Sequence, residues 1–169
     1  MPKPFLILQL RPEDETSDNE YESILKYSGL TKEDTYRIRI EKKGIPENLK
    51  LDEYSGVIVG GSPFDISIPE DEKSDIQKKI EQDFKRLFDD IVKNDFPFLG
   101  ACSGNGLLGS YLGTSISSHY REAVGCVEVE LTEAGKQDPL LSGYPDKISV
   151  LLGHKEACDS TPEGATLLM

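Results

Sequence analysis

Basic residues and long hydrophobic runs are scarce in this sequence, and their scarcity excludes two classes of partner. Lys and Arg number 19 against 31 Asp and Glu, so the net charge is −12 at neutral pH. A surface with that charge repels phosphate backbones and anionic membranes. The apolar stretch at residues 5–10 has six residues and is followed by charged ones, which is too short for a secretion signal or a membrane span. We expect no nucleic-acid partner and no membrane partner.

Cysteine and histidine are also few. The three cysteines, Cys102, Cys126 and Cys158, are an odd number at wide spacing in a chain that is long enough to fold without disulfides. This pattern favours a reducing, cytoplasmic location. The cysteines and the two histidines lack the spacing of a zinc site, and the acidic runs lack the spacing of a calcium loop. No motif indicates a cofactor, so we predict neither a metal nor a cofactor.

The length and the pattern of the chain predict one α/β domain over residues 1–169. A chain of this length with 37% hydrophobic residues can form one core of its own. Apolar runs alternate with amphipathic helical patterns, which is typical of a parallel sheet covered by helices. We therefore predict a doubly wound, flavodoxin-like α/β fold. The predicted strands are residues 5–10, 35–41, 56–63 and 96–102, and the predicted helices are 16–28, 72–93 and 105–113.

Local features refine three of these elements. Thr16 or Ser17 can cap the first helix, and Gly29 can end it. Residues 35–41 alternate apolar with charged side chains, which favours a strand near the edge of the sheet. The long helix has an apolar stripe that we expect to pack on the sheet. The stripe consists of Ile76, Ile80, Phe84, Leu87, Phe88 and Ile91.

The pattern changes beyond residue 114. Residues 124–133 and 147–154 are strand-like and flank a turn-rich stretch, so we predict an antiparallel pair beside the main sheet. The apolar residues 164–169 predict one further strand. Because such a strand would leave an apolar edge uncovered, we expect the domain to lack its C-terminal part and the natural chain to continue beyond Met169.

The sequence places Cys102 between a predicted strand and a predicted helix. Its neighbours are all small, in the order Gly100-Ala101-Cys102-Ser103-Gly104. A nucleophile elbow needs small residues at such a turn, because the strand must bend sharply into the helix. The thiol would then project above the sheet, where the helix N-terminus stabilises a thiolate. The alternative is a buried structural cysteine, and we favour the nucleophile because of this context.

A second glycine-rich turn follows the strand at residues 56–63. Gly60, Gly61 and Ser62 can expose backbone N–H groups at the same edge of the sheet. Together with the Ser103 N–H they could form an oxyanion hole for a tetrahedral intermediate. A phosphate-binding loop is the weaker interpretation, because no Gly-Lys-Ser/Thr sequence follows and no helix begins directly after the turn.

An ordered series of motifs resembles the class I glutamine amidotransferase family, especially its stand-alone members that are similar to the amidotransferase domain of GMP synthase. The resemblance runs over nearly the whole chain, and the ordered series is more specific than any single motif. The motifs are GVIVGGSP, FPFLGACSGNGLLGSYLG, EAVGCVEVELTEAG, DPLLSGYP and VLLGHKEACDSTPEGATLL.

The resemblance implies a cysteine hydrolase with a Cys-His-Glu triad. Cys102 would attack the side-chain amide of glutamine, form a glutamyl thioester and release ammonia. The Ser103 amide and the turn at Gly61 and Ser62 would stabilise the oxyanion. Ammonia would pass to a partner synthetase or stay unused.

Two departures from the family pattern leave alternatives open. Gly106 stands where the family has a glutamine that seats the substrate, so the substrate could be a different γ-glutamyl molecule. The family's catalytic His-x-Glu is expected beyond Met169. His154 and Glu156 have the same spacing, but they lie where the family has an earlier histidine, so we treat them as weaker candidates. The alternatives are a γ-glutamyl peptidase of the same superfamily and a catalytically silent binding subunit.

Overall fold

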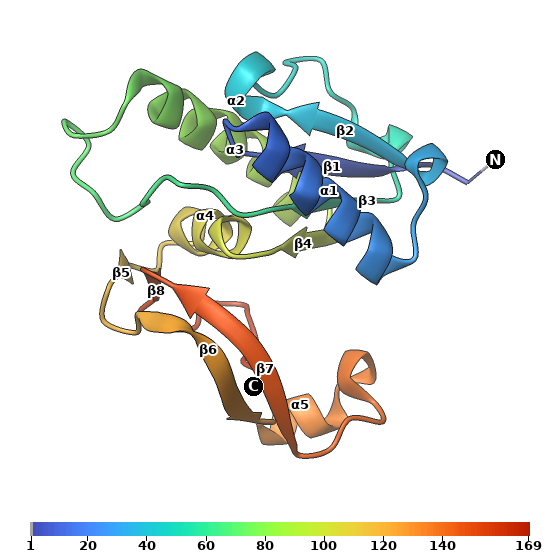
Figure 1. The fold of residues 1–169 in the computed structure, drawn as a ribbon, viewed down its shortest axis with the longest axis vertical. Coiled ribbons are helices and arrows are strands. Elements are labelled where there is room, and N and C mark those ends of the chain that lie inside the picture. The colour runs from blue at the N-terminus through green and yellow to red at the C-terminus, as the bar shows by residue number, and fades with distance from the viewer. Residues whose placement is uncertain (1) are drawn as a thin grey trace.

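A four-stranded parallel sheet forms the centre of the computed structural model, which describes residues 2–169 (Figure 1). The strand order is β2-β1-β3-β4. This order and the helices on both faces confirm the predicted doubly wound α/β fold. The strands are β1 (Phe5–Gln9), β2 (Thr35–Arg39), β3 (Gly56–Val59) and β4 (Phe98–Gly100).

The side chains of the central strands alternate between two apolar layers. Ile7 and Ile58 pack against helix α1 (Asp14–Ser28) on one face. On the other face, Leu6, Leu8, Val57 and Val59 pack with helices α3 (Asp75–Lys93) and α4 (Ser103–Tyr111). Because both faces are covered, these strands are almost entirely apolar.

Helix α1 begins earlier than predicted. Its first residue is Asp14, and the residue before it, Glu13, makes no capping hydrogen bond through its side chain. The predicted cap residue Ser17 is instead fully buried within the helix, where its hydroxyl accepts a hydrogen bond from Arg37. The predicted end is confirmed: Gly29 has φ 72°, a left-handed conformation that favours glycine.

Helix α3 confirms the predicted amphipathic pattern with one exception. Ser74 caps the helix by accepting a hydrogen bond from the Gln77 amide. Phe84 and Phe88 lie at the centre of the buried stripe, with ring centroids 5.5 Å apart. Ile76 is 53% exposed and does not belong to the stripe. It lies in the first turn, where the buried residue is Gln77 instead.

Strand β4 is shorter and more exposed than the predicted strand 96–102. It has only three residues, and Leu99 is 61% exposed. The strand thus differs from the central strands, which are covered on both faces. In residues 2–169, β4 pairs only with β3 and forms one edge of the sheet, while β2 forms the other edge as predicted. Helix α4 starts directly after the turn at Ala101 and Cys102.

The C-terminal part projects from the sheet as a long antiparallel pair, β6 (Glu122–Glu130) and β7 (Lys147–His154), which confirms the predicted flank (Figure 1). Residues 164–169 form no strand, so that prediction was wrong. Instead, Thr132 N donates to the Leu168 carbonyl. The short elements are α2 (Ile40–Lys43), β5 (Ile116–Ser117), α5 (Glu133–Gln137) and β8 (Ala157–Cys158).

No helix in residues 2–169 combines the length and the apolar character that crossing a membrane requires.

Phe84 and Ile76 in α3 differ strongly in burial and provide a test of the packing. Phe84→Ala should lower the free energy of unfolding by about 3–5 kcal/mol, because it leaves a cavity beneath the sheet. Ile76→Ala should change it by less than about 0.5 kcal/mol, because that side chain lies at the surface. Urea unfolding of both variants measures the difference. Equal losses for the two variants would contradict the described packing.

Candidate active site

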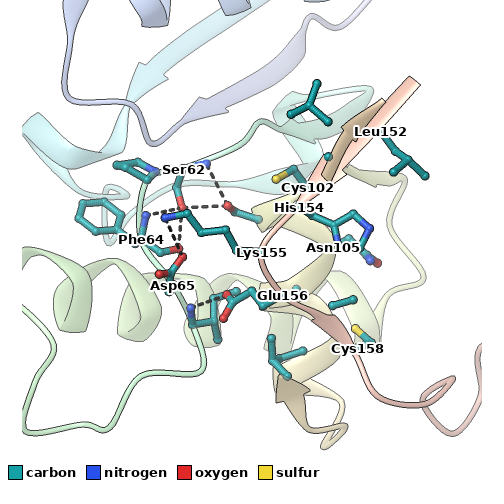
Figure 2. Close-up of a pocket in the computed structure, with 18 of the residues that line it drawn as sticks. Ser62, Phe64, Asp65, Cys102, Asn105, Leu152, His154, Lys155, Glu156 and Cys158 are labelled. Carbon is teal, nitrogen blue, oxygen red and sulfur yellow. Dashed lines mark hydrogen bonds and ion pairs between the residues drawn. The ribbon is translucent and has the colours of Figure 1, made fainter. Parts of the chain in front are cut away.

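An open cavity of about 810 Å³ lies at the carboxyl ends of the parallel strands (Figure 2). This is the edge at which open α/β sheets bind ligands. The cavity wall is formed by the loop after β3, the start of α4 and the end of β7. Cys102, Ser62 and Ser103 line it, as do His154 and Glu156. Gly61 lies beneath this wall: a Cβ placed on it would be 3.7 Å from Cys102 Cβ.

The Cys102 thiol is presented by a strained turn. Cys102 has φ 54° and ψ −109°, and the residue is exposed. A non-glycine residue at positive φ costs on the order of 1–3 kcal/mol and persists only where the surroundings enforce it. The following helix begins at Ser103, and the next three amides, of Gly104, Asn105 and Gly106, already donate to the carbonyls of Ala101 and Cys102.

Two glycines allow the close approach that enforces this turn. A Cβ on Gly100 would lie 2.6 Å from the Gly104 carbonyl carbon and 2.8 Å from the Asn105 nitrogen. A Cβ on Gly104 would lie 2.9 Å from the Val59 Cβ. These atoms belong to backbone or to the packed core and cannot move aside cheaply. Both flanking glycines are therefore needed for helix α4 to sit directly on strands β3 and β4.

The predicted two-sided oxyanion hole is not formed in this structure. Gly61 N donates to Glu20 Oε1 at 3.0 Å, and Ser62 N donates to Ser103 Oγ at 2.9 Å. Both amides are thus already occupied by side chains that the sequence pattern did not single out. In residues 2–169, Ser103 N makes no hydrogen bond, which leaves it as the free donor beside Cys102.

His154 and Glu156 do not pair with each other. The His154 Nε2 lies 3.1 Å from Glu122 Oε2, across the β6–β7 pair. Glu156 accepts hydrogen bonds from the Ile66 and Ser67 amides at 2.5 and 3.0 Å. Glu156 therefore anchors the loop after β3. Although Glu156 is only two residues from His154 along the chain, the two side chains do not form an imidazole–carboxylate pair.

The two imidazoles make no hydrogen bond with the Cys102 thiol within residues 2–169. His154 Nδ1 is buried and has no partner there. His119 is an exposed residue whose ring packs edge-on against Tyr120. His119 lies in a turn.

The other two cysteines differ from Cys102. Cys126 is exposed on β6, on the side opposite the half-buried Val127 and Val129. Cys158 also lines the cavity but is partly buried, and burial raises the pKa of its thiol, helped by the charge of Asp159. Within residues 2–169, no three Cys, His, Asp or Glu side chains converge to hold a metal ion.

Arg11 and Ile66 also line the cavity, and neither was predicted from the sequence. Ile66 fills the space left by the absent side chain of Gly106, because a Cβ there would lie 2.8 Å from Ile66 Cδ1. Arg11 directly follows the first predicted strand, and only this place in the chain could have indicated that it lines the cavity. Ile66 comes from an irregular loop, for which no local pattern exists.

Removal of the Glu156 anchor should loosen the loop after β3. Glu156→Ala leaves the Ile66 and Ser67 amides without a charged acceptor and should cost about 2 kcal/mol of stability. Hydrogen exchange of both amides should accelerate. Glu163→Ala, which removes the same charge from an exposed site, should change neither. Unchanged exchange at both amides in Glu156→Ala would contradict the anchoring role.

No protein-family model matches the chain. The chain is 38% identical over 68 residues to a subunit of the glutamine-hydrolysing GMP synthase of Methanoculleus marisnigri, covering 40% of this chain and 35% of that protein. It is 30% identical over 116 residues to the corresponding GMP synthase subunit of Methanoregula boonei, covering 69% of this chain and 52% of that protein. The chain thus spans between a third and about half of these relatives.

The fold matches a crystal structure of a glutamine amidotransferase from Thermotoga maritima with a TM-score of 0.72 and 24% identity. The match covers 99% of this chain and 67% of that one. The sequence relatives and the shared fold agree with the motif series and confirm that the chain resembles class I glutamine amidotransferase-like proteins.

Proposed function

We propose that Cys102 is the nucleophile of a glutaminase site that releases ammonia from glutamine. The strained turn at Cys102 is the observation that supports this most strongly, because it presents the thiol to the cavity at the start of α4. The relatives at 30% identity or more are GMP synthase subunits whose names specify glutamine hydrolysis.

The proposed reaction has two steps. The Cys102 thiolate attacks the carboxamide carbon, the C–N bond breaks, and the nitrogen leaves as ammonia after it receives a proton. Water then attacks the glutamyl thioester, which gives glutamate and restores the thiol. In both steps the Ser103 amide would donate to the oxyanion, a contribution typically worth about 3 kcal/mol. Gly61 and Ser62 would add donors only after their amides leave Glu20 and Ser103.

The proton transfers need an imidazole, and we do not place His154 in that role. Its Nε2 is directed to Glu122, and the pair ties the start of β6 to the end of β7. We therefore assign only the nucleophile and one oxyanion donor to this chain. The ammonia would pass to a synthetase partner, in keeping with the relatives that are named as subunits of GMP synthase.

One observation in the structure favours each of the two alternative functions. Ile66 occupies the space that a side chain at Gly106 would fill. This changes the wall that faces the substrate and favours a γ-glutamyl peptidase. The occupied amides of Gly61 and Ser62 favour a catalytically silent binding subunit. Measurement of glutamate release from glutamine and from γ-glutamyl dipeptides distinguishes the three functions: glutaminase, γ-glutamyl peptidase and silent subunit. The Cys102→Ser variant is the negative control. Release from glutamine that Cys102→Ser retains would contradict the proposal.

The three cysteines provide an internal comparison of thiol reactivity. Cys102 should be alkylated by iodoacetamide at least about tenfold faster than Cys126, because its strained turn presents the thiol to the open cavity at the start of α4, whereas Cys126 lies on a strand outside the cavity. Cys158 should be the slowest at neutral pH, because its raised pKa leaves less thiolate, and its rate should increase with pH above neutrality. Peptide mapping by mass spectrometry measures all three rates in one sample. Equal rates at Cys102 and Cys126 would refute an activated nucleophile.

The structural role of His154 has its own test. His154→Ala should leave the alkylation rate of Cys102 unchanged within about twofold at every pH, while it destabilises the β6–β7 pair by about 0.5–1 kcal/mol through loss of the Glu122 contact. Glu122→Ala should reproduce the stability effect, because it removes the oxygen that His154 Nε2 contacts. A drop in the Cys102 rate of tenfold or more in His154→Ala would instead assign His154 as the base.

A further inference from the structure

Arg11 is held beside the cavity by a shared carboxylate. Its Nε donates to Glu20 Oε1 at 2.9 Å. The same oxygen accepts the Gly61 amide at 3.0 Å, and the second oxygen accepts Gln9 Nε2 at 2.9 Å. The Glu20 side chain is only 15% exposed, and Gln9 is fully buried. The guanidinium is therefore fixed along one edge, while its terminal nitrogens are left to face outward.

These terminal nitrogens lie close to the Cys102 side chain. A Cβ placed on Gly61 would lie 2.5 Å from Arg11 Nη2 and 3.7 Å from Cys102 Cβ. The guanidinium and the thiol-bearing carbon thus border the same small space above Gly61. Both residues line the cavity. Within residues 2–169, neither Nη1 nor Nη2 of Arg11 has a hydrogen-bond acceptor.

The other charged groups of the cavity are engaged or turned outward. Lys155 is 79% exposed and lies 3.7 Å from Asp65. Glu156 is occupied by the two amides of the loop. A negatively charged ligand that reaches Cys102 would therefore meet unpaired donors at Arg11. The planar fork of an arginine fits a carboxylate with two parallel hydrogen bonds.

We infer that Arg11 binds the carboxylate of the substrate whose amide Cys102 attacks, and that it selects amides that carry a free carboxylate. This inference rests on the proposed function and adds to it the residue that sets the substrate class. Arg11 acts on binding and orientation and takes no part in the bond changes.

The test compares two electrophiles that differ only at the carboxylate. The first is the chloromethyl ketone analogue of glutamine, and the second is the same molecule with its α-carboxylate converted to a carboxamide. In each case the Cys102 thiolate forms a C–S bond as the C–Cl bond breaks and chloride leaves. Labelling needs only the nucleophile, so it does not depend on turnover.

The wild-type protein should label about 10- to 100-fold faster at Cys102 with the carboxylate form than with the carboxamide form. Arg11→Met should reduce this ratio to within about twofold of unity, and Arg11→Lys should retain part of it. Lys155→Met is the matched control, because it removes the same charge from the lining of the same cavity, and it should keep the wild-type ratio.

A wild-type ratio near unity would overturn the inference, as would an Arg11→Met variant that keeps the full ratio. An equal slowing of both probes in Arg11→Met and in Arg11→Lys would also overturn it, because that result means a structural role. The rate with iodoacetamide and the circular dichroism spectrum report whether each variant is folded. Failure of the proposed function looks different: the wild-type protein then releases no glutamate, while the labelling ratio still reports on Arg11.

Discussion

The contact between helix α4 and strand β3 is the constraint on which the site depends. Gly104 lies so close to Val59 that any side chain would collide with it, and Gly100 lies as close to the backbone of α4. Because of this proximity, the connection between β4 and α4 is too short to adopt an unstrained conformation. The single residue between Ala101 and the helix must therefore take a positive φ, and that residue is Cys102. The direction of the thiol follows from the packing of the backbone.

A second constraint fixes the opposite wall of the cavity. Gln9 at the carboxyl end of β1 and Ser17 on α1 are fully buried polar residues, and they connect Glu20 on α1 with Arg37 on β2. Buried polar groups are costly unless each has a partner, so such a network tolerates few arrangements. Through Glu20 it fixes both the Gly61 amide and the Arg11 side chain. The same network thus sets which donors face the thiol.

The parts that the sequence predicts well are those that depend on local pattern. The parallel strands, the buried face of α3 and the β6–β7 pair follow from apolar periodicity, and the turn at Cys102 follows from the small residues around it. The errors concern contacts between distant segments. Nothing near Gly61 or Ser62 in the chain indicates that Glu20 and Ser103 will take their amides. Glu156 has a histidine two residues away, yet it binds a loop about ninety residues earlier. The exposure of Leu99 likewise depends on which strands flank β4, which no local pattern reports.

The central claim is that the backbone at Cys102 aims the thiol into the cavity beside a free amide. A crystal structure of the protein labelled with the chloromethyl ketone analogue of glutamine tests it most directly. We expect a covalent bond to the sulfur of Cys102, a positive φ at that residue, and the ketone-derived oxygen within hydrogen-bond distance of Ser103 N. A label attached elsewhere, or a Cys102 with negative φ and its sulfur packed into the core, would contradict the claim.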